Sequence, residues 1–177
     1  MSGRSFHLLS EERKDKIEKW EYKRDKYIAR MKSAKLILLG ECIPANKYFY
    51  DINTDYENRG LRYTLKKEFN KIEITDSLFL ESMVRKGIAL FDCALCPLYH
   101  MDNISLRRKA ATHCFMTINR FLLDEHPQIP VATIFPAHLG YLKTEIPAEI
   151  LSRVKGEFSF YDQTGLSQLY ESLKESR

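Results

Sequence analysis

The sequence lacks the features that direct a protein into or across a membrane. No apolar run approaches the roughly 20 residues that a helix needs to span a bilayer, and residues 1–10 hold no apolar stretch of signal-peptide length. We therefore expect an intracellular, cytoplasmic protein with no membrane partner. In that compartment its four cysteines are expected to be reduced thiols rather than a disulfide framework.

Motifs of the common nucleotide-dependent and nucleophilic enzymes are also absent. The chain has no G-x-S-x-G elbow, no G-x-x-x-x-G-K-[ST] loop and no G-x-G-x-x-G fingerprint. Nucleophilic triads and nucleotide-driven chemistry therefore have no basis in the sequence, and we expect no cofactor. There is no internal repeat and no low-complexity tract.

The net charge of +4 comes entirely from one segment. Residues 11–35 carry ten Lys or Arg and six Asp or Glu, and the rest of the chain carries eighteen of each. A basic segment can contact phosphates, although mixed charge is also typical of a solvated helix face. Sparse apolar residues at helical spacing, Trp20 and Tyr27 among them, predict a helix to about residue 31 that docks on the domain.

At 177 residues the chain is long enough for one domain with a substantial core. We expect an N-terminal helical extension over residues 1–33 and a single domain over residues 34–177. Apolar runs predict strands at residues 35–39, 88–95 and 131–135, with a weaker one at 157–161. Predicted domain helices cover residues 60–69, 78–86, about 103–123, 148–153 and 166–174. This order predicts a three-layer α/β/α fold with a central four-stranded parallel sheet.

Polar residues that could take part in catalysis or binding lie at or after the predicted strand ends. Gly40 is expected to end the first strand, with Glu41 directly after it, and Asp92, His138 and Asp162 accompany the other three strands. Because the carboxyl ends of parallel strands meet at one edge of a sheet, we expect these side chains to gather there. A solvated glutamate in a plain turn is the alternative interpretation of Glu41.

A metal site has a weaker basis. Cys93 and Cys96 have the C-x-x-C spacing, and His100 follows four residues later. Thiolates and imidazoles are good zinc ligands, but Cys93 lies inside an apolar predicted strand and Pro97 follows Cys96 directly. We therefore expect buried free thiols rather than a metal centre or a redox pair.

The stretch from Leu36 to Tyr50, L-I-L-L-G-E-C-I-P-A-N-K-Y-F-Y, resembles the first motif of the uracil-DNA glycosylase superfamily. Members have an apolar strand, a glycine, an acidic or amide residue, and a proline-containing loop that leads to an aromatic residue. The resemblance covers residues 34–174 in layout, but only this stretch in motif. It implies the family's four-stranded parallel sheet with flanking helices.

The resemblance further implies hydrolysis of N-glycosidic bonds in DNA repair, with DNA or a nucleobase-containing ligand as partner. Glu41 would position water or stabilise the cationic sugar, and Phe49 or Tyr48 would stack on a flipped base. The residue that reads the base edge would fall at Asp92 or Cys93, and an ionised aspartate accepts hydrogen bonds but cannot donate them. The implied substrate-binding residues are Gly40, Cys42, Tyr48, Phe49, Cys93 and Asp162.

The last motif of that family is where the chain departs from it. Members commonly carry a His-Pro-Ser-type loop after the fourth strand, whereas residues 161–165, Y-D-Q-T-G, contain no histidine. Residues 135–139, F-P-A-H-L, echo that loop but follow the third predicted strand. With a different strand count, His138 becomes the electrophilic residue and Leu139 a duplex wedge; a structural histidine is the alternative.

Two further functions stay open at this point. A non-catalytic nucleotide- or protein-binding module on the same fold would use Glu41 as a hydrogen-bond acceptor, and the missing histidine favours it. An interaction protein whose N-terminal helix docks a partner is the third.

Overall fold

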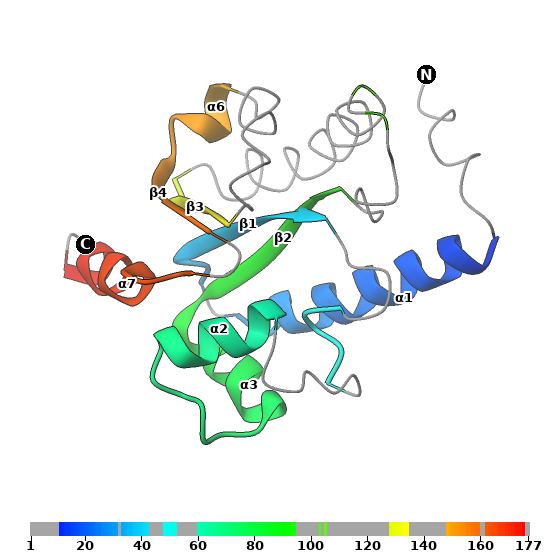
Figure 1. Cartoon of the computed structure of the whole chain (residues 1–177), viewed down its shortest axis with the longest axis horizontal. Coiled ribbons are helices and arrows are strands. Elements are labelled where there is room, and N and C mark those ends of the chain that lie inside the picture. Colours follow the sequence, from blue (N-terminus) through cyan, green and yellow to red (C-terminus); the bar gives the residue numbers. More distant parts are fainter. Residues whose placement is uncertain are drawn as a thin grey trace.

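The centre of the protein is a four-stranded sheet in which β1 (Leu36–Cys42) pairs with β2 (Ile88–Ala94) and β3 (Val131–Ile134), and β3 pairs with β4 (Val154–Phe158), all in parallel. The computed structural model describes residues 11–31, 33–42, 48–52, 60–94, 103, 105, 128–134, 148–159 and 162–175. Of residues 11–14, 16, 17, 41, 42, 93 and 94 it describes the backbone alone. The strand order is β2-β1-β3-β4 (Figure 1), and the predicted α/β class with a four-stranded parallel sheet is confirmed.

The described helices are α1 (Glu11–Ile28), α2 (Gly60–Glu68), α3 (Asp76–Lys86), α6 (Ala148–Leu151) and α7 (Leu166–Glu175). None of them combines the length and apolarity that crossing a bilayer requires. The predicted helix over about residues 103–123 lies outside the described residues, apart from two single positions.

Both faces of β1 are buried, which explains its continuous apolar run. Side chains alternate between the faces of a strand, and Leu36 and Leu38 join the core cluster that includes residues of α2, α3 and α7. Ile37 and Leu39, which occupy the alternate positions, are equally inaccessible to solvent. A strand buried on both sides gains from apolar residues at every position.

Three local predictions are wrong in detail. Gly40 does not end the first strand, because β1 continues through it to Cys42. The fourth strand begins three residues earlier than predicted, at Val154. Helix α3 begins two residues earlier than predicted, at Asp76, after the N-cap Thr75, whose hydroxyl accepts from the backbone N–H of Leu78. The predicted end of that helix at residue 86 is confirmed.

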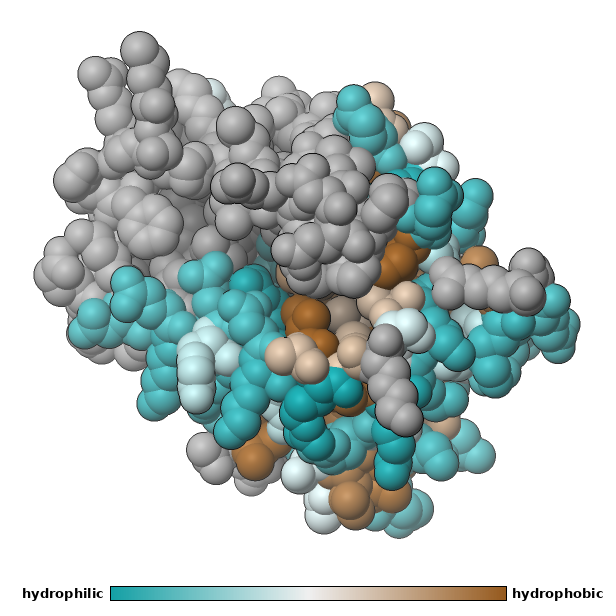
Figure 2. All heavy atoms as spheres, turned by 180° about the vertical axis from the view of Figure 1, so that it is seen from behind, coloured by the Kyte–Doolittle hydropathy of each residue, from teal (hydrophilic) through white to brown (hydrophobic). Residues whose placement is uncertain are grey.

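Surface apolar side chains among the described residues do not come from one segment. Figure 2 shows a largely hydrophilic face, apart from the atoms drawn in grey, with separate smaller apolar areas. The large exposed apolar residues are Tyr22, Ile52, Ile72, Leu78 and Leu151. Scattered residues of this kind are normal on a folded protein and do not by themselves indicate an interface.

Candidate functional site

The carboxyl end of β1 lies where the chain changes direction across the sheet. From β1 the chain crosses to β2 on one side, whereas β3, the next strand in sequence, pairs with β1 on the other side (Figure 1). In open parallel sheets such a switch point leaves a crevice outside the strand ends, and ligands bind there. Gly40 marks this place, because it pairs with Asp92 of β2 and with Ile134 of β3. Glu41 is the next residue of β1.

Asp92 explains why β1 contains a glycine. A Cβ atom placed on Gly40 would stand 2.9 Å from Oδ1 of Asp92. Asp92 is 9% exposed, so its carboxylate lies largely out of solvent beside the glycine. A glycine inside a strand often marks such a close approach. The glycine of the motif therefore makes room for an acidic side chain on the neighbouring strand.

Replacing Gly40 with alanine is expected to lower the free energy of unfolding by about 0.5–1.5 kcal/mol, because the Asp92 carboxylate must rotate away from the added methyl group. The measurement is urea denaturation of both single variants and of the double variant with Asp92→Ala. The cost of Gly40→Ala should shrink once the carboxylate is gone, which a double-mutant cycle detects. Equal costs in both backgrounds would show that the contact with Asp92 does not require glycine.

Tyr50 forms hydrogen bonds with the backbone of β2. Its hydroxyl accepts from the backbone N–H of Leu90 at 2.8 Å and donates to the carbonyl of the same residue at 3.1 Å. Burial first, and the charge of Asp92 in addition, raise the pKa of the Tyr50 phenol despite the opposing effects of the Leu90 bond and Arg24. Unpaired groups on an edge strand invite pairing with other chains, and this contact satisfies those of Leu90 within the protein.

Tyr48 and Phe49, the predicted stacking residues, are packed inside the protein. Their exposed fractions are 1% and 4%, and both rings contact Tyr50, with centroids 5.7 and 5.1 Å from its ring. Burial, and next the charge of Asp92, raise the pKa of the Tyr48 phenol well above its usual value. The charge of Asp92 thus acts on the Tyr48 phenol, while neither ring presents a face to solvent. A stacking role for either residue stays a prediction.

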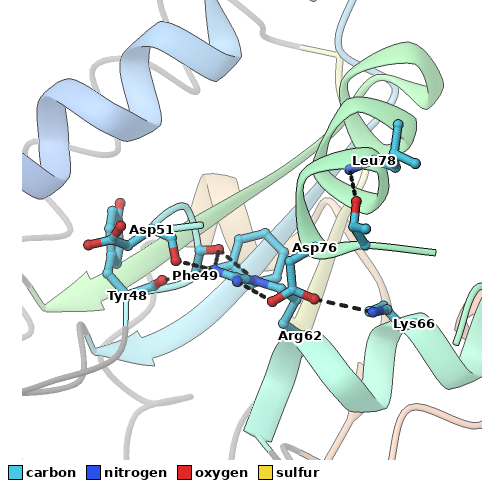
Figure 3. Close-up of polar contacts among 8 residues, drawn as sticks. Tyr48, Phe49, Asp51, Arg62, Lys66, Asp76 and Leu78 are labelled. Carbon is cyan, nitrogen blue, oxygen red and sulfur yellow. Dashed lines mark hydrogen bonds and ion pairs between the residues drawn. The ribbon is translucent and has the colours of Figure 1, made fainter. Parts of the chain in front are cut away.

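Arg62 of α2 holds this segment in place, and it is not among the site residues that the sequence predicts. Its guanidinium is fully buried and donates to the carbonyl oxygens of Tyr48, Phe49 and Asp51 (Figure 3). The distances are 3.1 Å to the first and 3.0 Å to the last. An arginine beside Leu61 at the start of an apolar helical stripe was the only signal available in the sequence.

Asp76, the first residue of α3, supplies the counter-charge. Its Oδ2 lies 2.5 Å from Nη1 of Arg62, and its Oδ1 lies 3.2 Å from Nζ of Lys66 (Figure 3). Burial acts to raise the pKa of Asp76, but the hydrogen bonds and charges of Arg62 and Lys66 outweigh it and lower that pKa. The carboxylate therefore stays ionised, and α2, α3 and residues 48–51 are joined through one guanidinium.

Asp162 belongs to a different part of the sheet edge. It is exposed in the turn between β4 and α7, where its Oδ1 accepts from the N–H and the hydroxyl of Thr164 at 3.0 and 2.6 Å. The hydroxyl bond first, and then the N–H bond, lower its pKa. Because β1 and β3 separate β4 from β2, strand spacing alone puts the two ends about 14 Å apart. The structure therefore does not bring Asp162 and Asp92 together.

The other predicted site residues are described only in part. Glu41, Cys42 and Cys93 have strand backbone, and His138 lies outside the described residues. No cluster of three or more His, Cys, Asp or Glu side chains that could hold a metal ion occurs within the part of the chain that is described. The possible metal site also includes Cys96 and His100, which lie outside the described residues.

Comparison with known proteins adds no assignment to this site. The chain matches no protein-family model, no curated protein and no solved structure. The function is therefore inferred from the chain's own residues and their arrangement.

Proposed function

We propose that the chain is a glycosylase-like protein that acts on, or binds, a base in nucleic acid through Glu41 and Asp92. One observation carries the proposal. The strand that holds the motif lies at the switch point of the sheet, and the Asp92 carboxylate packs beside the motif glycine, one residue before Glu41. Two acidic positions thus lie at the edge where open α/β sheets bind their ligands. Consecutive positions of a strand belong to opposite faces of a sheet, so a ligand that contacts both must lie across this edge.

Carboxylates suit the chemistry of this proposal. Cleavage of an N-glycosidic bond develops positive charge on the sugar, and a nearby carboxylate stabilises that charge or orients the attacking water. We assign this role to Glu41. An ionised Asp92 can only accept hydrogen bonds, so it suits a base that presents an amino group, such as cytosine or adenine, better than it suits the carbonyl edge of uracil.

The test is release of bases from single-stranded oligonucleotides that carry a panel of deaminated, oxidised and alkylated bases. Abasic sites are detected by alkaline strand cleavage. We expect release from at least one substrate, and a fall of about 100-fold or more in Glu41→Gln, because the charge that stabilises the transition state is lost. Asp92→Asn should change the order of preference among bases, because an amide also donates.

Glu149→Gln is the matched control, since Glu149 is an exposed carboxylate on α6. It should release bases at the wild-type rate. The catalytic proposal fails if Glu41→Gln keeps full activity on every substrate that the wild type attacks. It fails equally if the Glu149 variant loses as much activity as the Glu41 variant.

The burial of Tyr48 and Phe49 favours a second candidate, a non-catalytic nucleotide- or protein-binding module on the same fold. A glycosylase needs an accessible aromatic surface for the flipped base, whereas a binding module can recognise its ligand through the acidic groups alone. Saturable binding of an oligonucleotide or nucleoside with no base release would support this candidate. Release of a base in the same mixture would exclude it.

A further inference from the structure

One face of α1 covers the aromatic residues that follow β1. The ring of Trp20 lies 5.6 Å from that of Tyr48, and the ring of Tyr27 lies 5.5 Å from that of Tyr50, measured between centroids. Between these two, the guanidinium carbon of Arg24 lies 5.2 Å from the centre of the Phe91 ring. Residues spaced by three and four lie on the same side of a helix, so a single side of α1 makes all three contacts.

Two ionic links also join α1, or the residues just after it, to the domain. Nζ of Lys23 lies 2.6 Å from Oδ1 of Asp51, and Arg30, two residues beyond the helix, donates to the Glu81 carboxylate at 2.6 and 2.5 Å. Among the described side chains of α1, Trp20 belongs to the buried core cluster and Tyr27 packs against it. Partly exposed ion pairs contribute little to stability, and segments with few buried apolar contacts open more readily than the core.

Residues 48–50, which α1 covers, are also held by contacts that do not involve α1. Arg62 binds the carbonyls of Tyr48 and Phe49, and the hydroxyl of Tyr50 binds the backbone of Leu90. Beyond the helix, the N–H of Lys35 donates to the carbonyl of Gly87 at 2.7 Å, which fixes the start of β1. Residues 48–50 and the sheet therefore keep their anchors when contacts to α1 are lost.

We propose that α1 is a displaceable cover over Tyr48 and Tyr50, which lifts while the sheet, α2 and α3 stay folded. Lifting exposes the Tyr48 ring, which α1 covers through Trp20. The buried arrangement is then the closed state of the surface on which a base would stack. The ligand assigned to that surface rests on the proposed function, whereas the motion of α1 does not.

The experiment compares two double variants that remove the same charge from this N-terminal segment. Lys23→Gln with Arg30→Gln removes the ionic links, and Lys19→Gln with Lys26→Gln removes two exposed lysines as a control. Loss of two partly exposed ion pairs should shift the equilibrium between closed and open α1 by up to about tenfold. We expect amide hydrogen exchange of α1 to accelerate by about that factor in the first variant, with β1 and β2 unchanged.

Trp20 is the single tryptophan of the chain, so its fluorescence reports on the cover directly. Acrylamide quenching of Trp20 should rise in the variant without ionic links and stay at the wild-type level in the control. If α1 amides and sheet amides exchange together in every variant, the helix opens only with the whole domain and the inference is wrong. Equal acceleration in the control variant would also overturn it.

A separate arm tests the ligand, with single-stranded oligonucleotides carrying the damaged bases used above. When only the open state binds, the apparent Kd falls by the factor by which its population rises. The variant without ionic links should therefore bind up to about tenfold more tightly than the control. Faster α1 exchange with unchanged affinity would support the cover and refute base recognition at Tyr48.

Discussion

Replacing Arg62 with methionine is expected to lower the free energy of unfolding by about 3–5 kcal/mol, as loss of one partner of a buried charged network typically does. The substitution removes the guanidinium that donates to the carbonyls of Tyr48, Phe49 and Asp51, and it takes from Asp76 the nearer of its two cations, Arg62 and Lys66. Buried polar groups without partners carry most of this cost. Urea denaturation followed by circular dichroism measures it.

Arg30→Met is the matched control, because it removes an arginine–carboxylate pair of similar length from the surface. Its cost should stay below about 1 kcal/mol. A further variant separates the ion pair from the carbonyl contacts: adding Asp76→Leu to Arg62→Met should restore little, since the backbone carbonyls still lack the hydrogen bonds from the guanidinium. If Arg62→Met costs no more than the control, the buried guanidinium does not hold residues 48–51.

Replacing Gly87 with alanine is expected to cost about 2–5 kcal/mol. Gly87 ends α3 with φ of +72°, and its N–H bonds to the carbonyls of Met83 and Val84. A Cβ there would lie 2.3 Å from the backbone carbonyl oxygen of Ser33. The left-handed conformation alone costs an alanine about 1–2 kcal/mol, and the collision with a backbone that has no rotamer to change adds about 1–3 kcal/mol.

Gly165→Ala separates these two terms. Gly165 also has a positive φ, of +92°, but among the described residues other than its chain neighbours no atom lies within 4 Å of the place where its Cβ would be. Only the conformational cost applies, so the loss in the free energy of unfolding should be about 1–2 kcal/mol. Equal losses for the two variants, measured by urea denaturation, would show that the chain before β1 moves freely away from Gly87.

Much of the fold could be predicted because its signals are local. Leu61 and Leu65 repeat at helical spacing, and α2 lies where that spacing predicts it. Helix α3 ends at Gly87 in the left-handed conformation, which other residues adopt only at an energetic cost. The apolar runs at the starts of β1 and β2 require burial on both faces, which a parallel sheet provides.

Other features depend on contacts between distant residues and could not be read from neighbours in the chain. Gly40 looks like the end of a strand, yet it lies inside β1 because Asp92 needs the space. Gly156 similarly weakens the signal for β4, whereas in the structure a Cβ there would lie 2.9 Å from a methyl group of Leu169 on α7. Glycine is disfavoured in strands in general, and only the packing partner reveals the exception.

Some features of the candidate site are visible in the sequence, and others appear only in the structure. The motif around Glu41 and the acid at Asp92 are visible in the sequence, whereas the pairing of their strands is a finding of the structure. The chain does not show in advance that Tyr48 and Phe49 face the core, or that Arg62 binds their carbonyls. Glu68 gives another example, because it accepts from the N–H groups of Gly165 and Ser167 at the start of α7.

The sequence by itself determined the α/β class, the parallel sheet and the acidic positions at the strand ends, because apolar periodicity and turn residues act over a few neighbours. The tertiary structure alone decided which polar groups meet. It placed Asp92 against Gly40, the Arg62 guanidinium among three carbonyls, and α1 over the aromatic residues after β1. Buried polar groups must find partners wherever the fold brings them, and those partners lie many residues away in the chain.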